Sequence, residues 1–174
     1  MADKHHLFAV TYWLLKAAAL LLFVIMGAIV LGLIGLGIAA VVGFDPEVMA
    51  DMGMSMPQIV RVGVFALLAA LVCLVMLQVA VMLTTRIVES AMSGNPFVPE
   101  NATRLTQIGW LMLAMEVAGM LVNMTLSYLL PEKIADDINF ETAPVGLFGI
   151  LLIFVMAQIF RHGTELRADL EGTV

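Results

Sequence analysis

Charged residues are scarce in this sequence. Only 13% of its 174 residues are charged and 62% are hydrophobic, whereas a soluble domain holds about 25% charged and about 45–50% apolar residues. The mean hydropathy is +1.05, so the composition is that of an integral membrane protein. The formal net charge of −6 argues against direct nucleic-acid binding, because that role requires a basic surface that displaces counterions from the phosphates.

Cysteine and histidine are almost absent. The single cysteine, Cys73, excludes an intramolecular disulfide, a cysteine-based metal site and the quinone-coupled disulfide oxidoreductases, which all need cysteine pairs. His5, His6 and His162 lie at or beyond the ends of the apolar runs, so no span carries a histidine that could ligate haem. The sequence also has no nucleophile–base set, phosphate-binding glycine loop or pair of catalytic carboxylates. We therefore expect neither an enzyme nor a bound cofactor.

Four apolar runs are long enough to cross a bilayer, since a hydrocarbon core of about 30 Å needs about 20 helical residues. The chain is therefore predicted to be all-α, a single membrane domain over residues 1–174 that forms a four-helix bundle. Small residues recur at every fourth position in Gly35, Ala39 and Gly43 and also in Ala28 and Gly32, and this spacing lets helices approach closely. We expect this packing within the bundle, with homo-oligomerisation as the alternative. The predicted spans are about 15–42, 62–85, 108–130 and 142–160.

Lysine and arginine are distributed unevenly among the segments that flank the spans. The N-terminal segment, the central loop 86–105 and the tail 161–174 hold six of the eight basic residues. The other two loops hold only Arg61 and Lys133, together with seven of the 14 acids. Because basic loops stay on the cytoplasmic side of a membrane, both termini and the central loop are predicted to be cytoplasmic.

The central loop 86–105 contains signals that end one helix and begin the next. Gly94 is predicted to end the second helix in a left-handed conformation. Pro99 and Glu100 are predicted to begin the third helix, because proline suits the first turn and an acid suits the positive end of the helix dipole. Phe97 lies between the two helices. Its ring either packs back on the bundle or is presented to a partner.

The polar side chains inside the predicted spans include Gln78, Glu116 and Asn123. Glu116 is the only acid in a predicted hydrocarbon core, and an ionisable group that faces lipid is costly. We therefore expect it to face the bundle interior, where Gln78 at a similar depth donates a hydrogen bond to its carboxyl group. Two roles remain open for Glu116: an acid that couples transport to protons or cations, or a protonated structural group held by hydrogen bonds.

The first outer loop is rich in methionine. Thioethers are soft ligands that select monovalent copper, so this cluster is a candidate site for copper or silver. The chain has 14 methionines in total, however, and an apolar cap on the bundle is the alternative interpretation. The cluster consists of Met49, Met52, Met54 and Met56.

Two segments of the chain, Gly94–Leu105 and Phe160–Val174, resemble the two signatures of a bacterial membrane family catalogued as domain of unknown function 2975. The resemblance covers nearly the whole chain and implies a multi-pass protein of the bacterial inner membrane with four spans and no established activity. Members of that family are often encoded beside a small helix-turn-helix regulator, which implies a membrane protein that holds or releases a transcription regulator. The matching residues are Pro96, Phe97, Asn101, Leu105, Arg161, Gly163, Leu166, Thr173 and Val174.

These observations favour a regulatory or interaction protein that binds a cytoplasmic partner. Phe97, Leu166 and Leu170 would supply the apolar contacts, and Arg104 and Arg161 would contribute to a polar rim, because interface energy concentrates in buried aromatic and apolar anchors. The alternative function is a small proton- or cation-coupled transporter that uses Glu116.

Replacement of Glu116 separates the two functions. We expect Glu116→Gln to leave the thermal unfolding of the purified protein unchanged, because the amide keeps the size and hydrogen-bonding capacity of a protonated carboxyl group. Unfolding in detergent and proton uptake by proteoliposomes are the measurements. Substrate-dependent proton uptake that the wild type shows and the variant lacks would establish the transporter instead.

Overall fold

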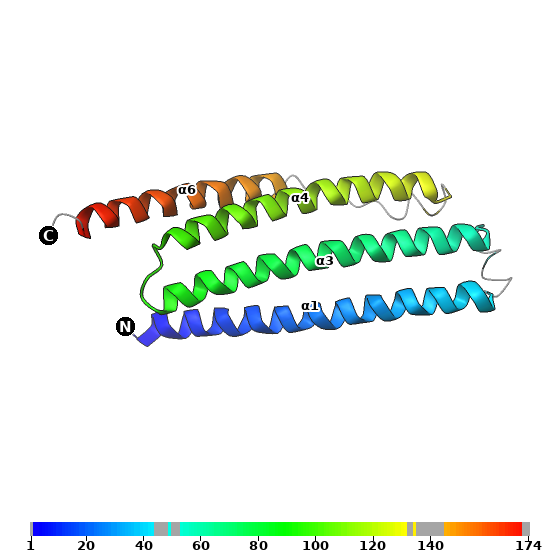
Figure 1. Cartoon of the computed structure of the whole chain (residues 1–174), viewed down its shortest axis with the longest axis horizontal. Coiled ribbons are helices and arrows are strands. Elements are labelled where there is room, and N and C mark those ends of the chain that lie inside the picture. Colours follow the sequence, from blue (N-terminus) through cyan, green and yellow to red (C-terminus); the bar gives the residue numbers. More distant parts are fainter. Residues whose placement is uncertain (1, 44–48, 50–52, 132–133, 135–144, 172–174) are drawn as a thin grey trace. The chain divides into compact units, whose positions relative to one another are not determined.

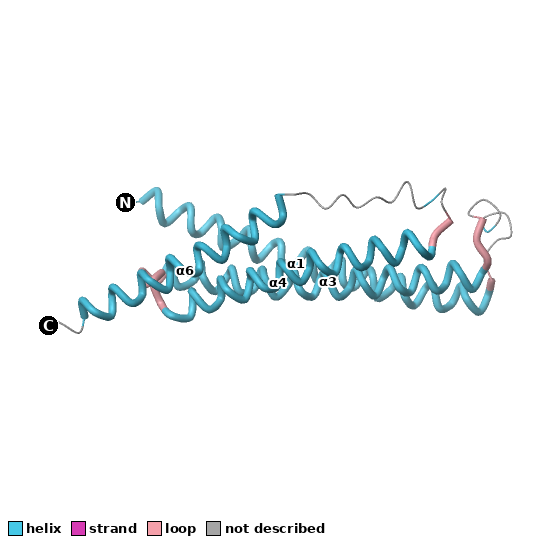
Figure 2. Tube along the Cα trace, turned by 90° about the horizontal axis from the view of Figure 1, so that it is seen from above, coloured by secondary structure: helices cyan, strands magenta, loops and turns pink. Residues whose placement is uncertain are grey.

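The computed structural model describes residues 2–43, 49, 53–131, 134 and 145–171. Within these residues the chain forms four helices and no strand, as the sequence predicts (Figures 1 and 2). All four are long and apolar enough to cross a membrane. The helices are α1 (Ala2–Val42), α3 (Met56–Met92), α4 (Pro99–Leu129) and α6 (Val145–Glu171).

Each helix extends beyond its predicted span. The helices have 41, 37, 31 and 27 residues in chain order, whereas about 20 residues cross the hydrocarbon core. A helix satisfies its backbone hydrogen bonds within its own segment, which is why helical structure is required wherever the chain contacts lipid. The central segment 86–105 therefore consists of the end of α3, a six-residue connection (93–98) and the start of α4. The tail is the end of α6, which passes through Gly163 without a break.

The chain divides into two compact units. Unit 1 comprises Met1–Leu22, Met76–Met115 and Ala143–Val174, and unit 2 comprises Phe23–Val75 and Glu116–Thr142. Helices α1, α3 and α4 contribute residues to both units, whereas α6 belongs wholly to unit 1. The start of α1, the central connection and the end of α6 therefore all belong to unit 1. The side of the membrane that unit 1 faces remains a prediction from the distribution of Lys and Arg.

Small residues allow α1 and α3 to pack closely within unit 2. A Cβ atom on Gly63 would lie 2.7 Å from Leu36 Cδ2, so only glycine fits there without a shift. Gly32 lies against Leu67: a Cβ atom on this glycine would lie 3.8 Å from Leu67 Cδ1. Gly35, by contrast, has open space around its Cβ position among the described residues. Of the two predicted stripes of small residues on α1, the one that contains Gly32 contacts α3.

Large apolar side chains cover the outer face of α1. Leu31 is 69% exposed and Val41 is 88% exposed. In water such a surface would be costly, but lipid tails are as apolar as leucine, so burial against protein brings little advantage in a bilayer. The exposed face of α1 is consistent with a membrane helix that contacts its neighbours on one side only.

The end of α3 has the geometry that the sequence predicts. Gly94 adopts a left-handed φ of +84°. Its backbone N–H donates to Ala91 O and that of Asn95 donates to Ser90 O, both at 3.1 Å. These two bonds are the Schellman arrangement, in which the first residues after a helix satisfy its last carbonyl groups.

Replacement of Gly94 by alanine should destabilise the protein. A left-handed backbone costs an L-residue about 1–2 kcal/mol, so we expect Gly94→Ala to lower the free energy of unfolding by about that amount. Gly27→Ala is the control, because Gly27 is helical and its Cβ position meets no described atom within 4 Å. Equal unfolding transitions for the two variants in detergent would contradict the assigned backbone conformation.

Candidate functional site

A buried asparagine organises the connection between α3 and α4 in unit 1. Asn101 is 0% exposed. Its Nδ2 donates to Ser90 Oγ at the end of α3 and to Pro96 O in the connection, the latter at 2.8 Å. Its Oδ1 accepts a hydrogen bond from Arg104 Nη1 at 2.8 Å, and its backbone N–H donates to Val98 O at 3.0 Å. A single side chain thus joins the end of one helix, the connection and the start of the next helix.

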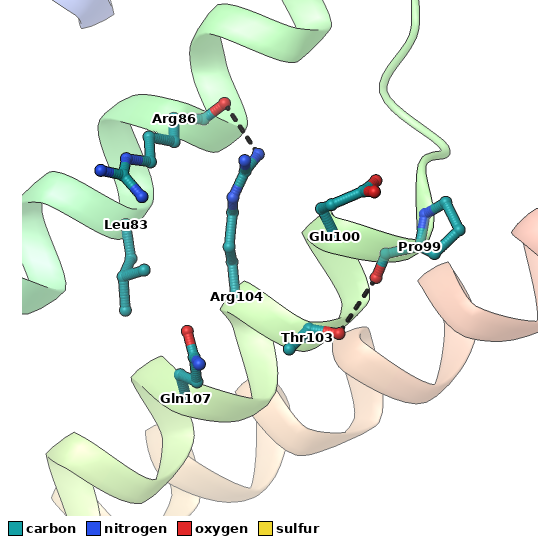
Figure 3. A pocket seen from close by; sticks show the side chains of 7 residues that line it. All are labelled: Leu83, Arg86, Pro99, Glu100, Thr103, Arg104 and Gln107. Atoms are coloured by element: carbon teal, nitrogen blue, oxygen red, sulfur yellow. Dashed lines mark hydrogen bonds between the residues drawn. The ribbon is translucent and has the colours of Figure 1, made fainter.

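Arg104 extends this network back to α3. Its Nη1 also donates to the backbone carbonyl of Arg86 at 3.4 Å, as Figure 3 shows. The guanidinium group is therefore held at two points by the protein itself, and the residue is half-buried. Beside it lies a hollow of about 320 Å³ between the end of α3 and the start of α4. The hollow is lined by Leu83, Arg86, Pro99, Glu100, Thr103, Arg104 and Gln107.

The central connection packs against α6. The Phe97 ring centroid lies 5.2 Å from that of Phe160, with the two planes tilted by 35°. A Cβ atom on Gly163 would lie 2.9 Å from Phe97 Cδ1, so the absence of a side chain at Gly163 makes room for the ring. A hydrogen bond from Arg167 Nη1 to Asn95 Oδ1 adds a polar link between the two segments. Both predicted signatures therefore meet in one place.

Phe97 combines the two alternatives that the sequence leaves open. One side of its ring contacts α6, yet 42% of the residue remains exposed. Leu166, further along α6, is 53% exposed, and Arg161 is exposed as well. We call Phe97, Arg161 and Leu166 the loop–tail surface. Leu170 belongs to α6, but its side chain lies outside the described part of the structure.

A second hollow, of about 310 Å³, lies between the start of α4 and α6. Arg161, Thr164 and Glu165 line it from α6, and Pro99 and Thr103 are among its residues from α4. His162 Nδ1 lies 3.6 Å from Glu165 Oε2 on the exposed side of the helix. This contact is an ion pair when the imidazole is protonated, and it does not involve Arg161.

Close packing in the apolar part of unit 1 holds α4 against α6. A Cβ atom on Gly109 would lie 2.9 Å from Phe154 Cε1. The Trp110 ring meets the same phenylalanine edge-on, with centroids 5.5 Å apart and planes at 75°. These contacts fix how the start of α4 and the end of α6 lie beside each other. They thereby determine where Phe97 can reach α6.

The polar residues of the spans belong to different units. Gln78, in unit 1, is buried, and its Oε1 has no hydrogen-bond partner among the described residues. Glu116 and Asn123 belong to unit 2 and are half-buried. The hydrogen bond predicted between Gln78 and Glu116 would join the two units, so it remains a prediction.

The methionine cluster is only partly described. Met54 is buried, Met49 and Met56 are half-buried, and Met52 lies outside the described residues. The backbone N–H of Met54 donates to Met49 O at 3.4 Å. No group of three or more His, Cys, Asp or Glu residues in the described ranges could hold a metal ion. That search does not concern thioether ligands, so the copper hypothesis remains a prediction.

Sequence patterns give the residues that organise the site local roles but not their partners. Asn95 is predicted to form a turn with Pro96, Asn101 to lie at the start of the third helix and Gly163 at the point where the tail leaves the membrane, whereas Ser90 carries no signal. Asn101 and Ser90 are 11 positions apart, and Phe97 and Gly163 are 66 positions apart. No local pattern identifies such pairs. Phe97 and Gly163 each lie in one of the two family signatures, which is a signal for that pair, whereas Ser90 lies in neither signature.

The fold and this site together define a four-helix membrane protein with an organised connection between its second and third spans. The chain belongs to the DUF2975 family, whose model carries the description of a protein of unknown function and matches residues 47–174. The match includes α3, α4 and α6, and therefore every residue of the site. No curated protein and no solved structure matches the chain.

Loss of the Asn101 amide should weaken the whole connection. We expect Asn101→Ala to lower the free energy of unfolding by about 1–3 kcal/mol, because buried polar partners are left unsatisfied. Thr103→Ala is the matched control on the same helix, since its exposed hydroxyl donates only to Pro99 O, at 3.2 Å. Its effect should stay within about 0.5 kcal/mol. The measurement is thermal unfolding in detergent. An equally small decrease in stability for both variants would show that Asn101 is not the organising residue.

Proposed function

We propose that this protein is a multi-pass regulatory protein of the bacterial inner membrane that binds a cytoplasmic protein through the loop–tail surface. The observation that carries the proposal is the state of Phe97. Its ring is held in one orientation by Gly163 and Phe160, yet 42% of the residue remains exposed. An aromatic ring whose orientation is already fixed in the free protein loses little conformational entropy on binding. Such residues are frequent anchors of interfaces.

Leu166 supports the same assignment. It lies beyond the predicted end of the fourth span, in the polar sequence RHGTELRADLEGTV. Lipid tails that cover exposed leucines within the predicted spans would therefore not cover this one. An exposed leucine on a polar helix beside an exposed aromatic ring suits a protein partner. The exposed Arg161 would contribute to the rim of the contact.

The identity of the partner is inferred from family resemblance and charge. Resemblance to DUF2975 implies a small helix-turn-helix regulator, and such a protein presents a basic surface to DNA. Glu89, Glu100 and Glu165 are exposed in unit 1. Acidic side chains beside an apolar anchor complement a basic partner and speed its association. Binding of the regulator by its DNA-contacting face would keep it from its operator.

We assign Arg104 a positioning role and not a direct contact with the partner. Its guanidinium group is bonded to Asn101 and to the backbone of Arg86. We therefore assign it to holding the connection in shape, so that it acts on partner binding through Phe97. Arg161 and Leu166 remain the direct contacts from α6.

Capture of the regulator from native membranes tests the proposal. The full chain, Phe97→Ala, Leu166→Ala and a control, Met92→Ala, would each be affinity-purified and their partners quantified by mass spectrometry. Met92 is a suitable control because it is an apolar residue at the end of α3 with the same 42% exposure as Phe97. Loss of an interface anchor costs about 2 kcal/mol or more, so recovery should fall by more than about tenfold for the first two variants.

The decisive result is recovery of a small helix-turn-helix protein with the wild type and Met92→Ala and its loss from the other two. The purified regulator should then bind the wild type in nanodiscs and be displaced by its own operator DNA. The same set of partners from all four proteins would contradict the proposal, as would a regulator that binds the membrane protein and its operator simultaneously.

A further inference from the structure

The hollow between α3 and α4 differs in chemistry from the loop–tail surface. Two arginines line it, one from each helix, together with the apolar Leu83 and the polar Gln107. Its volume is about 320 Å³, which is sufficient for a small polar group but too small for a protein segment with its side chains. Figure 3 shows Arg104 extending from α4 toward α3, with Arg86 and Glu100 on either side of it in that view.

The two guanidinium groups have unused hydrogen-bonding capacity. Arginine has five N–H donors, and Arg104 uses Nη1 for both of its recorded bonds, to Asn101 Oδ1 and Arg86 O. For the Arg86 side chain, no acceptor is recorded among the described residues, and the residue is exposed. No ion pair is recorded for Arg86 or Arg104 among the described residues. Neither arginine of the hollow is therefore neutralised by a described carboxylate.

The position along the chain places this hollow at the level of lipid headgroups. Arg86 directly follows an uncharged run of 24 residues, 62–85, and Leu83 is part of that run. The hollow therefore spans the point where the apolar segment ends and charge begins. The distribution of Lys and Arg predicts that this end faces the cytoplasm, where the leaflet carries anionic lipids and basic pockets between helices bind their headgroups.

We propose that Arg86 and Arg104 form a binding site for the phosphate group of an anionic phospholipid. Guanidinium groups match phosphate oxygens in bidentate geometry, and Arg104 is already fixed in position by Asn101. Leu83 would contact the start of the lipid's apolar part.

Glu100 determines which phosphate the site accepts. Its carboxylate lines the same hollow and repels negative charge, so a doubly charged free phosphate is disfavoured. A carboxylate accepts hydrogen bonds from hydroxyl groups. A singly charged phosphodiester with a hydroxyl-bearing headgroup, such as phosphatidylglycerol, satisfies the arginines and Glu100 together.

Native mass spectrometry of the full chain in detergent tests this assignment. The wild type, Arg86→Gln and Lys16→Gln would be incubated with phosphatidylglycerol or with phosphatidylcholine, and the fraction that retains one lipid would be measured. A basic side chain near an anionic surface contributes about 1 kcal/mol, so we expect Arg86→Gln to retain about fivefold less phosphatidylglycerol. Lys16→Gln removes the same charge from α1 outside the hollow and should retain as much as the wild type.

Two further arms identify the source of the phosphate and the role of Glu100. Inorganic phosphate should not displace bound phosphatidylglycerol, and Glu100→Gln should allow it to compete. Displacement from the wild type by inorganic phosphate would overturn the lipid assignment in favour of a free anion. If the wild type retained phosphatidylcholine as well as phosphatidylglycerol, the hollow would not be the proposed site for an anionic lipid. An equal loss of phosphatidylglycerol binding in Arg86→Gln and Lys16→Gln would likewise contradict the proposal. Thermal unfolding of each variant confirms that it remains folded.

Discussion

The shape of the connection between α3 and α4 in unit 1 depends on the buried side-chain amide of Asn101. The Schellman bonds hold the first residues of the connection 93–98, and the Asn101 side chain ties the connection at Pro96 to Ser90 on α3 and to Arg104 on α4. A buried amide that lost these partners would retain an uncompensated desolvation cost. The network therefore favours one arrangement of the connection over many alternatives. The position of Phe97 and the orientation of Arg104 both follow from that arrangement.

The start of α4 lines two hollows with different chemistry. On one side, Arg104 and Glu100 line a hollow with α3 that suits a lipid headgroup. On the other, Pro99 and Thr103 line a hollow with α6 beside the exposed Arg161. A partner bound at the loop–tail surface would therefore lie close to the proposed lipid site.

The sequence alone determined the features that depend on local chemistry or on composition. Long uncharged runs predict membrane helices because lipid offers no hydrogen-bond partners to the backbone, and all four helices are present. Gly94 and the Pro99–Glu100 pair predict one helix end and one helix start because left-handed backbone, fixed φ and dipole charge act within a single turn. Both boundaries occur where these signals lie. The family was likewise identified from its two short signatures.

Tertiary structure decided everything that depends on pairs of residues distant in the chain. The contact of Phe97 with Gly163 and the bond from Asn101 to Ser90 arise only when α3, α4 and α6 lie together. Nothing in the local spacing distinguishes these partners from many other polar and small residues. The hollow beside Arg86 is also a tertiary feature, because its two arginines are 18 positions apart. Sequence predicted which segments can cross a membrane, whereas packing determined which side chains the connection buries and which it leaves exposed.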